Sequence, residues 1–376
     1  MASAYTPGLT VAARTTIVKT RRLPLKGDVL VALGERVTPE TLVARAALPG
    51  VLQTVKVAAS LGIDPSEVEA ALTIKIGDSV ERGQAIARSS ALWGLIKSEA
   101  KASATGVVEL ISHVTGSVGI RLASTPVTVS AYVPGEVSKI LPREGVEIAA
   151  HGALIQGIFG VGGERVAPIA MAVSQPGSVL EAVDLRTEHA GKIVVGGSLV
   201  TAEALRRAGE LGVLGIVAGG IVDTELKDYL GYDIGVAITG HEDLPLSLVL
   251  TEGFGEISMA KKTFELLASL EGRRASLCGA TQIRAGVIRP EIIVADIDPR
   301  APNEGEDEVI PDFMLDIGAP VRLIREPYFG VLATVHSLPP ALTVVGSGAR
   351  VRVLQARLPD GSVVIVPRAN VEIVGG

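Results

Sequence analysis

Residues 76–87 read IGDSVERGQAIA, which is a turn, a short apolar strand, a second turn and a second apolar strand. The Gly-Asp and Arg-Gly steps supply the backbone freedom that tight turns need, and the alternating apolar positions put one face of each strand inward. The same order of turn, strand, glycine and strand occurs at 26–37 and at 134–146. We therefore expect repeated β-hairpin units within one N-terminal domain.

Seven positions of this stretch carry a resemblance to the barrel-sandwich hybrid family, in which the phrase GDxVxxGQxIA marks half of the sandwich. The matching residues are Gly77, Asp78, Val80, Gly83, Gln84, Ile86 and Ala87. The family includes biotinyl and lipoyl carrier domains, so the resemblance implies a barrel-sandwich hybrid fold for residues 1–185. Its carrier members acylate a lysine that usually follows Met or Asp, and this sequence has no Met-Lys or Asp-Lys dipeptide. We expect a structural sandwich without a cofactor.

Two further features lie in the N-terminal part. A helix start is predicted within residues 61–72, with Asp64 as the cap, Pro65 at the first helical position and Glu67 three residues after the cap. The glycine-dense run 151–164 is compatible with a phosphate-binding loop, but a proline soon after it would end the helix that such a loop requires. A strand pair with a glycine turn is the preferred interpretation of that run.

The periodicity changes near residue 190, and residues 186–295 predict an α/β module with a parallel sheet. Buried strands at 192–198 and 215–222 flank an amphipathic helix at 200–211, which makes a βαβ unit. The remaining expected elements are helices at 223–230 and 259–270 and strands at 234–240 and 246–250.

Polar side chains suited to a small anion follow these strands or lie in the glycine-rich run 279–290. Open parallel sheets bind ligands beyond the carboxyl ends of their strands. Glycines there allow close approach, hydroxyls and a His-Glu pair offer hydrogen bonds and proton exchange, and arginines bind carboxylate or phosphate. The candidate ligand-binding residues are Gly219, Gly220, Thr239, His241, Glu242, Thr251, Glu252, Thr281, Gln282, Arg284 and Arg289. The alternative is that they are turn residues and domain contacts.

No catalytic residue is predicted. The chain has no GxSxG motif, and Cys278 lies between Leu277 and Gly279 in an apolar setting that favours an inert thiol. Catalysis is therefore uncertain, and the sequence favours a protein that is not an enzyme.

An acidic segment at 296–317 predicts a linker to a C-terminal module at 318–376. Five short strands, with a hairpin turn at Asp360-Gly361, predict a small SH3-like barrel there. The module resembles the KOW family of ribosomal proteins and transcription elongation factors. The matching residues are Val321, Arg322, Ile324, Pro327, Phe329, Gly330, Val335, Val371, Glu372 and Ile373.

KOW barrels bind RNA or other proteins, so the resemblance implies the same for residues 318–376. Six arginines against two glutamates and one aspartate make this module locally basic. The candidate contact residues are Arg322, Arg325, Tyr328, Phe329, Arg350, Arg352 and Arg368. Alternating arginines also protect an exposed edge strand from aggregation, and that interpretation stays open.

Composition limits the partners and the location. The 376 residues carry 35 Lys and Arg against 41 Asp and Glu, a net charge of −6, which argues against an all-over electrostatic grip on nucleic acid. A hydrophobic fraction of 47% excludes a disordered chain. One cysteine and five scattered histidines predict no disulfide and no metal. No apolar run reaches bilayer length, so we expect a cytoplasmic protein without a membrane partner.

These observations, with 43 Gly and 21 Pro that favour short strands and tight turns, together predict an α+β multidomain protein with β-rich modules. We expect a non-catalytic scaffold or adaptor that acts through protein contacts or through self-assembly as a homo-oligomer, with RNA contact by the C-terminal barrel as a further expectation. Two alternatives stay open: a small-anion-binding enzyme or ligand sensor with its site in the α/β module, and a transcription- or translation-associated KOW factor.

Overall fold

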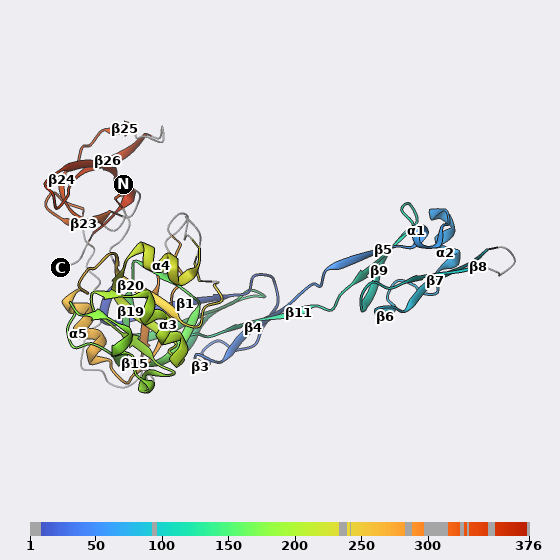
Figure 1. The fold of residues 1–376 in the computed structure, drawn as a ribbon, viewed down its shortest axis with the longest axis horizontal. Helices are drawn as coiled ribbons and strands as arrows, with labels where there is room; N and C mark the ends of the chain where they lie inside the picture. The colour runs from blue at the N-terminus through green and yellow to red at the C-terminus, as the bar shows by residue number, and fades with distance from the viewer. Residues whose placement is uncertain are drawn as a thin grey trace.

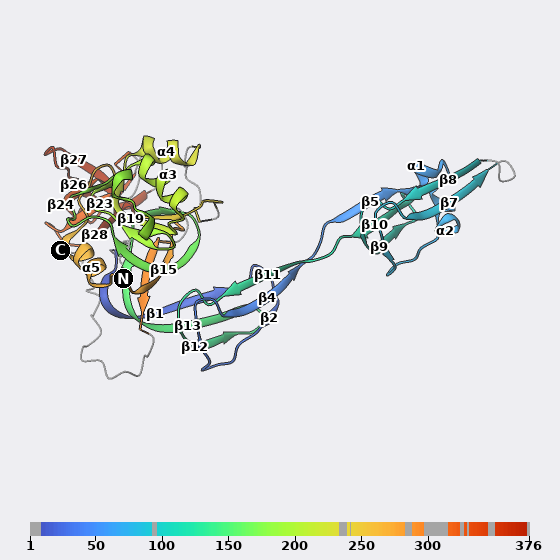
Figure 2. The same cartoon turned by 60° about the horizontal axis from the view of Figure 1, so that its bottom comes forward.

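The computed structural model describes residues 9–91, 96–232, 239–240, 242–282, 288–296, 315–323, 327–328, 331–344 and 350–373. It contains 48% strand and 15% helix in mixed sheets, which confirms the β-rich class predicted from the sequence. Figures 1 and 2 show a large head, an arm that projects far from it, and a smaller C-terminal sheet beside the head.

A 13-stranded mixed sheet forms the head. Its strands are β1 (Val11–Arg22), β3 (Arg36–Val37), β12 (Gly135–Leu141), β13 (Gly145–Gln156), β14 (Phe159–Val161), β15 (Glu164–Met171), β16 (Val179–Leu180), β17 (Ile193–Val195), β18 (Leu199–Val200), β19 (Gly215–Ile221), β20 (Ser247–Phe254), β21 (Arg274–Cys278) and β22 (Glu291–Ala295). The hydrogen-bonded order is β14-β20-β19-β17-β15-β21-β22-β13-β12-β3, with β1 on β13, β18 on β19 and β16 on β18. β15 joins the two halves, because it runs parallel to β17 and antiparallel to β21.

Helices cover both faces of the parallel half. α3 (Ala202–Leu211) and α4 (Asp223–Leu230) pack on one face, where Leu205 lies in a buried apolar cluster. α5 (Lys261–Ser269) packs on the other face, where Phe264 lies in a second cluster. Two short 3₁₀ helices, η2 (Ala182–Asp184) and η3 (Thr187–His189), precede β17. Burial on both faces explains why the strands of this half read as continuous apolar runs.

The local predictions for this half are confirmed where the structure describes the residues. β17 and β19 are parallel neighbours connected through α3, as the βαβ pattern predicted. The helices expected at 223–230 and 259–270 are α4 and α5. Most of the strand expected at 234–240, and of the linker expected at 296–317, lies outside the described residues.

A two-stranded ribbon connects the head to the arm. β4 (Leu42–Leu48) and β11 (Thr125–Ser130) pair antiparallel, and the register brings Leu48 opposite Thr125 at the far end. β2 (Asp28–Val29) pairs with β4 near the head. Figure 2 shows the ribbon leading away from the head to a separate body, which we call the arm domain, residues 49–124.

The arm domain has an apolar core of its own. Its elements are β5 (Leu52–Lys56), α1 (Val57–Leu61), η1 (Pro65–Glu67), α2 (Val68–Ala71), β6 (Ser79–Val80), β7 (Ala85–Ala91), β8 (Ile96–Lys101), β9 (Gly106–Ser112) and β10 (Ser117–Arg121). A four-stranded sheet, β5-β10-β9-β6, and the β7-β8 hairpin enclose a cluster that includes Ile86 and Ile120. The predicted cap is confirmed: the Asp64 carboxylate accepts from the Ser66 amide at 3.0 Å, and the Glu67 carboxylate accepts from the Asp64 amide at 3.3 Å.

A six-stranded sheet forms the C-terminal part. Its strands are β23 (Pro320–Leu323), β24 (Leu332–Ser337), β25 (Leu342–Val344), β26 (Arg350–Arg357), β27 (Val363–Pro367) and β28 (Val371–Ile373), with η4 (Arg368–Asn370) between the last two. The order is β25-β26-β24-β23-β28, with β27 on β26. The hairpin predicted at Asp360-Gly361 is confirmed, because β26 and β27 pair antiparallel on either side of it.

Candidate functional site

Two of the predicted ligand-binding threonines, Thr239 and Thr281, meet at β14. Thr239 Oγ1 donates to the Gly160 carbonyl at 2.8 Å and accepts from the Thr281 amide at 2.8 Å. Thr281 Oγ1 accepts from the Gly160 amide at 2.9 Å. Both side chains are buried, so in this arrangement their hydroxyls bind backbone groups and fasten β14 to two loops.

Glu242 extends this network at the end of β14. Its Oε2 accepts from the Gly162 amide at 2.9 Å and from the Gly240 amide at 2.7 Å. Two backbone donors on one oxygen fix the carboxylate firmly. The predicted neighbours His241 and Arg284 lie outside the described residues.

Gln282 and Arg289 lie before and after residues 283–287, which are outside the described ranges. The Gln282 amide donates to the Ile288 carbonyl at 2.9 Å, which brings the two sides together. Both Gln282 and Arg289 are half-buried. Thr239, Glu242, Thr281 and Gln282 thus lie in one region of the structure, and the contacts described there are to the protein's own backbone.

The predicted pair Gly219 and Gly220 lies near the end of β19, where the chain itself occupies the nearby space. A Cβ at Gly219 would lie 2.2 Å from the Ile257 carbonyl oxygen, and one at Gly220 would lie 2.1 Å from the Gly255 carbonyl oxygen. These glycines thus let residues 255–257 cross the strand end. Thr251 is also buried, and its hydroxyl donates to the Ala218 carbonyl at 3.4 Å.

Glu252 and Arg322, which the sequence suggested for two different roles, form one buried ion pair. Arg322 Nη2 lies 2.7 Å from Glu252 Oε2, and the side chains are 3% and 12% exposed. Glu252 Oε1 also accepts from the Ala260 amide at 3.0 Å. Within the described residues, Arg322 Nε has no hydrogen-bond partner. The pair joins β20 of the head to β23 of the C-terminal sheet.

The other predicted contact residues of the C-terminal sheet differ in exposure. Arg368 donates to the Val353 carbonyl at 3.1 Å and to the Pro339 carbonyl at 3.0 Å, so it supports the sheet from within. Arg350 and Arg352 are exposed on β26, and Tyr328 is half-buried. Two further candidates, Arg325 and Phe329, lie outside the described residues.

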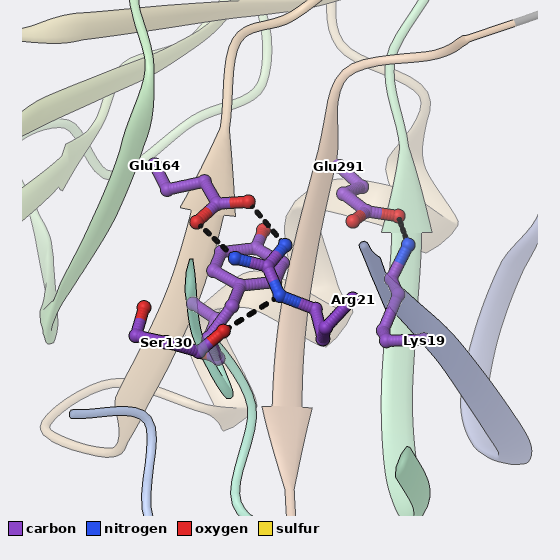
Figure 3. A network of polar contacts seen from close by, with 7 residues as sticks. Lys19, Arg21, Ser130, Glu164 and Glu291 are labelled. Carbon is purple, nitrogen blue, oxygen red and sulfur yellow. Dashed lines mark hydrogen bonds and ion pairs between the residues drawn. The ribbon is translucent and has the colours of Figure 1, made fainter. Parts of the chain in front are cut away.

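A cluster of charged side chains that the sequence analysis missed joins β1 to β15 and β22 (Figure 3). Arg21 donates to both oxygens of Glu164 at 2.6 and 2.8 Å and to the Ser130 carbonyl at 2.8 Å. Lys19 pairs with Glu291 at 2.5 Å. The spacing of Lys19 and Arg21 on one face of a strand was visible in the sequence, but the partner of Lys19 is more than 270 positions away and that of Arg21 more than 140.

Tyr132 and Cys278 lie beside this cluster. The Arg21 guanidinium carbon lies 5.3 Å from the centroid of the Tyr132 ring. Tyr132 has φ of 68° and is 2% exposed, and its hydroxyl has no hydrogen-bond partner in the described part of the chain. Burial, followed by the nearby Glu291, raises the pKa of that hydroxyl well above its usual value.

Cys278 is placed between two carboxylates. It pairs in register with Glu164 on β15 and with Glu291 on β22, so the three side chains share one row of the sheet. Burial raises the pKa of the thiol to about 11. A thiol with this pKa is protonated at neutral pH, and the two neighbouring carboxylates further disfavour the thiolate.

The arm domain presents apolar side chains to solvent. Val107 and Leu110 on β9, together with Val51, Ile76 and Val114, are between 43% and 89% exposed. A hollow of about 680 Å³ lies where the arm domain meets the ribbon, and Val107 and Arg121 are among its lining residues. Arg121 donates to Glu109 and to the Gly50 carbonyl, so it fixes β10 to the chain that enters the domain.

The chain matches no protein-family model and no curated protein. Within the described ranges, no group of three or more His, Cys, Asp and Glu side chains is arranged to hold a metal ion. The helices of those ranges are all too short or too polar to cross a membrane.

Proposed function

We propose that this protein is a non-catalytic scaffold or adaptor, and that the arm domain contacts a partner protein or a second copy of the chain away from the head. The observation that carries the proposal is the ribbon of β4 and β11, which holds the arm domain far from the head (Figure 2). The core of the arm domain draws all its members from residues 55–120, and the head clusters contain none of them. The arm domain therefore adds reach rather than stability to the head.

The exposed apolar residues of the arm domain support a protein contact. Scattered exposed apolar residues are ordinary, but those of the arm domain occur on a small body that the ribbon holds out into solvent. Gly119 on β10 is buried, and an added Cβ there would lie 3.2 Å from both Leu52 and Leu110, so these two leucines cover the strand at this point. Leu110 is 51% exposed, so the surface that a partner would meet here is apolar.

Two local features of the chain support the barrel-sandwich hybrid and KOW resemblances. The motif of residues 76–87 lies in the arm domain, where the Asp78 carboxylate accepts from the Lys75 amide at 2.9 Å and the Gln84 side chain accepts from the Glu81 amide at 2.8 Å. Both bonds close tight turns of the kind that the Gly-Asp and Arg-Gly steps of this stretch predict. The antiparallel six-stranded sheet at the C-terminal end supports the KOW resemblance.

Removing the arm domain tests the proposal. Replacing residues 49–124 by Asn-Gly joins Leu48 to Thr125, which are direct partners in the ribbon, through a two-residue hairpin turn. The shortened protein is expected to keep the unfolding midpoint of the head and to lose the protein contact. Sedimentation velocity over a range of concentrations measures self-association, and affinity capture with mass spectrometry compares partner sets.

Point variants test whether the protein contact depends on the exposed apolar side chains of the arm domain or only on the presence of that domain. Val107→Asp with Leu110→Asp is expected to weaken the same contact, whereas Val183→Asp, an exposed apolar position on the head, is expected to leave it unchanged. Assemblies and captured partners that are identical for the full and the shortened proteins would overturn the proposed function.

RNA contact by the C-terminal sheet is a second candidate function. It is favoured by Arg350 and Arg352, which are exposed two residues apart on β26. If both contact phosphates of single-stranded RNA, replacing both by Gln lowers the slope of log affinity against log salt by about 1.4. Arg206→Gln, an exposed arginine on α3, serves as the control and is expected to leave the slope unchanged. Binding that does not depend on salt, or an unchanged slope in the double variant, contradicts this candidate.

A further inference from the structure

A hollow lies at the carboxyl end of β15, the strand where the head sheet changes from parallel to antiparallel pairing. β15 pairs with β17 through residues 169–171 and with β21 through residues 164–168. Ligand sites of α/β sheets lie beyond the carboxyl ends of strands, where the topology changes. Residues 171–174, which lead out of β15, form one wall of the hollow, and α5 forms another.

The hollow has the volume of a small-molecule site, and its lining combines apolar and acidic side chains. Its volume is about 770 Å³, and sites for small ligands span about 300–1,000 Å³. The apolar lining consists of Met171, Ala172, Val173, Val179, Phe264 and Ala268. Phe264 belongs to the buried cluster beneath α5, so this lining is anchored in the core of the head.

The polar lining carries one sign of charge. Glu181, Asp184 and Glu271 line the hollow, and no lysine, arginine or histidine is among the described lining residues. Two of the carboxylates are held by backbone amides: Glu271 Oε1 accepts from the Met171 amide at 3.0 Å, and Asp184 Oδ2 accepts from the Glu181 amide at 2.9 Å. Each of these hydrogen bonds orients its carboxylate through one oxygen. The second oxygen of that carboxylate takes no part in the bond.

We propose that this hollow binds a primary ammonium or guanidinium group on an alkyl stem. The oriented carboxylates attract and hydrogen-bond the cation, and the apolar wall accommodates the stem. An anion is repelled by the same carboxylates. Such a cationic group occurs on a free alkylamine and on a lysine or arginine side chain of another protein.

The test compares two probes of equal length and opposite charge. Titration of the full chain with hexylammonium and with hexanoate, followed by saturation-transfer NMR, is expected to show binding of hexylammonium alone. Asp184→Asn and Glu271→Gln keep the side-chain oxygen that accepts from the backbone, and each is expected to weaken hexylammonium binding by about tenfold. Glu210→Gln, on the exposed face of α3, is the matched control and is expected to leave binding unchanged.

A second arm of the experiment identifies the source of the cation. A blocked Gly-Lys-Gly peptide that binds as tightly as hexylammonium, and that loses binding in the Glu271→Gln protein, assigns the site to a protein side chain. Binding of hexylammonium but not of the peptide assigns it to a free amine. Equal binding of hexanoate, no binding of either cation, or unchanged binding in the two lining variants would overturn the proposal.

Discussion

An Arg322→Met protein is expected to lose the docking of the C-terminal sheet against the head. The substitution leaves Glu252, which is 12% exposed, without its cation in a buried position. Removing one partner of a buried ion pair lowers the free energy of unfolding by about 3–5 kcal/mol. Most single substitutions on the surface lower it by much less. The expected result is a larger radius of gyration in solution scattering, together with faster amide exchange in β20 and β23.

Two further variants separate the ion pair from a general loss of stability. In Arg322→Met with Glu252→Gln no buried charge remains, and the glutamine still accepts from the Ala260 amide, so the double variant is expected to recover most of the docking. Arg357→Met alters an exposed arginine of the same sheet and is expected to change the unfolding free energy by less than about 0.5 kcal/mol. If Arg322→Met behaves like Arg357→Met, the pair does not hold the two sheets together.

Local structure in this chain was readable from the sequence because it depends on neighbouring residues. The cap at Asp64, the helices α3 to α5 and the hairpin at Asp360-Gly361 each follow from a few adjacent side chains. The three similar hairpin units at 26–37, 76–87 and 134–146 show the limit of this reasoning. They share a local pattern, yet the second lies in the arm domain and the others lie in the head or at the base of the ribbon. Partner strands distant in sequence decide that placement.

The candidate site follows the same rule. Thr239 and Glu242 were predicted because polar residues after strands gather at one edge of a sheet, and Thr281 was predicted because it lies in the polar, glycine-rich run 279–290. The pairing of Glu252 with Arg322 was not foreseen, because the two residues were assigned to different modules and their contact depends on how those modules dock. The acidic hollow was missed for a related reason, since Asp184 and Glu271 come together only once β15, η2 and α5 are in place.

An Ile120→Ala protein is expected to unfold in the arm domain while the head stays folded. Ile120 is fully buried in the core of the arm domain, and truncating a buried isoleucine to alanine costs about 2–5 kcal/mol. A domain with such a small core has a small free energy of unfolding. The ribbon of β4 and β11 connects it to the head, and the core clusters of the head contain none of its core residues. Hydrogen exchange followed by mass spectrometry should therefore show lost protection in peptides from residues 49–124 and unchanged protection in β15 to β20.

The matched control for this variant is Ile216→Ala, which removes the same atoms from a fully buried position in the head. It is expected to produce the reverse pattern, with weakened protection across the head sheet and an unchanged arm domain. Calorimetry should likewise resolve two unfolding transitions. Each variant is expected to lower the midpoint temperature of one of them. A single transition that both variants lower equally would mean that the arm domain and the head unfold as one unit, and the arm would then contribute to the stability of the head rather than only to its reach.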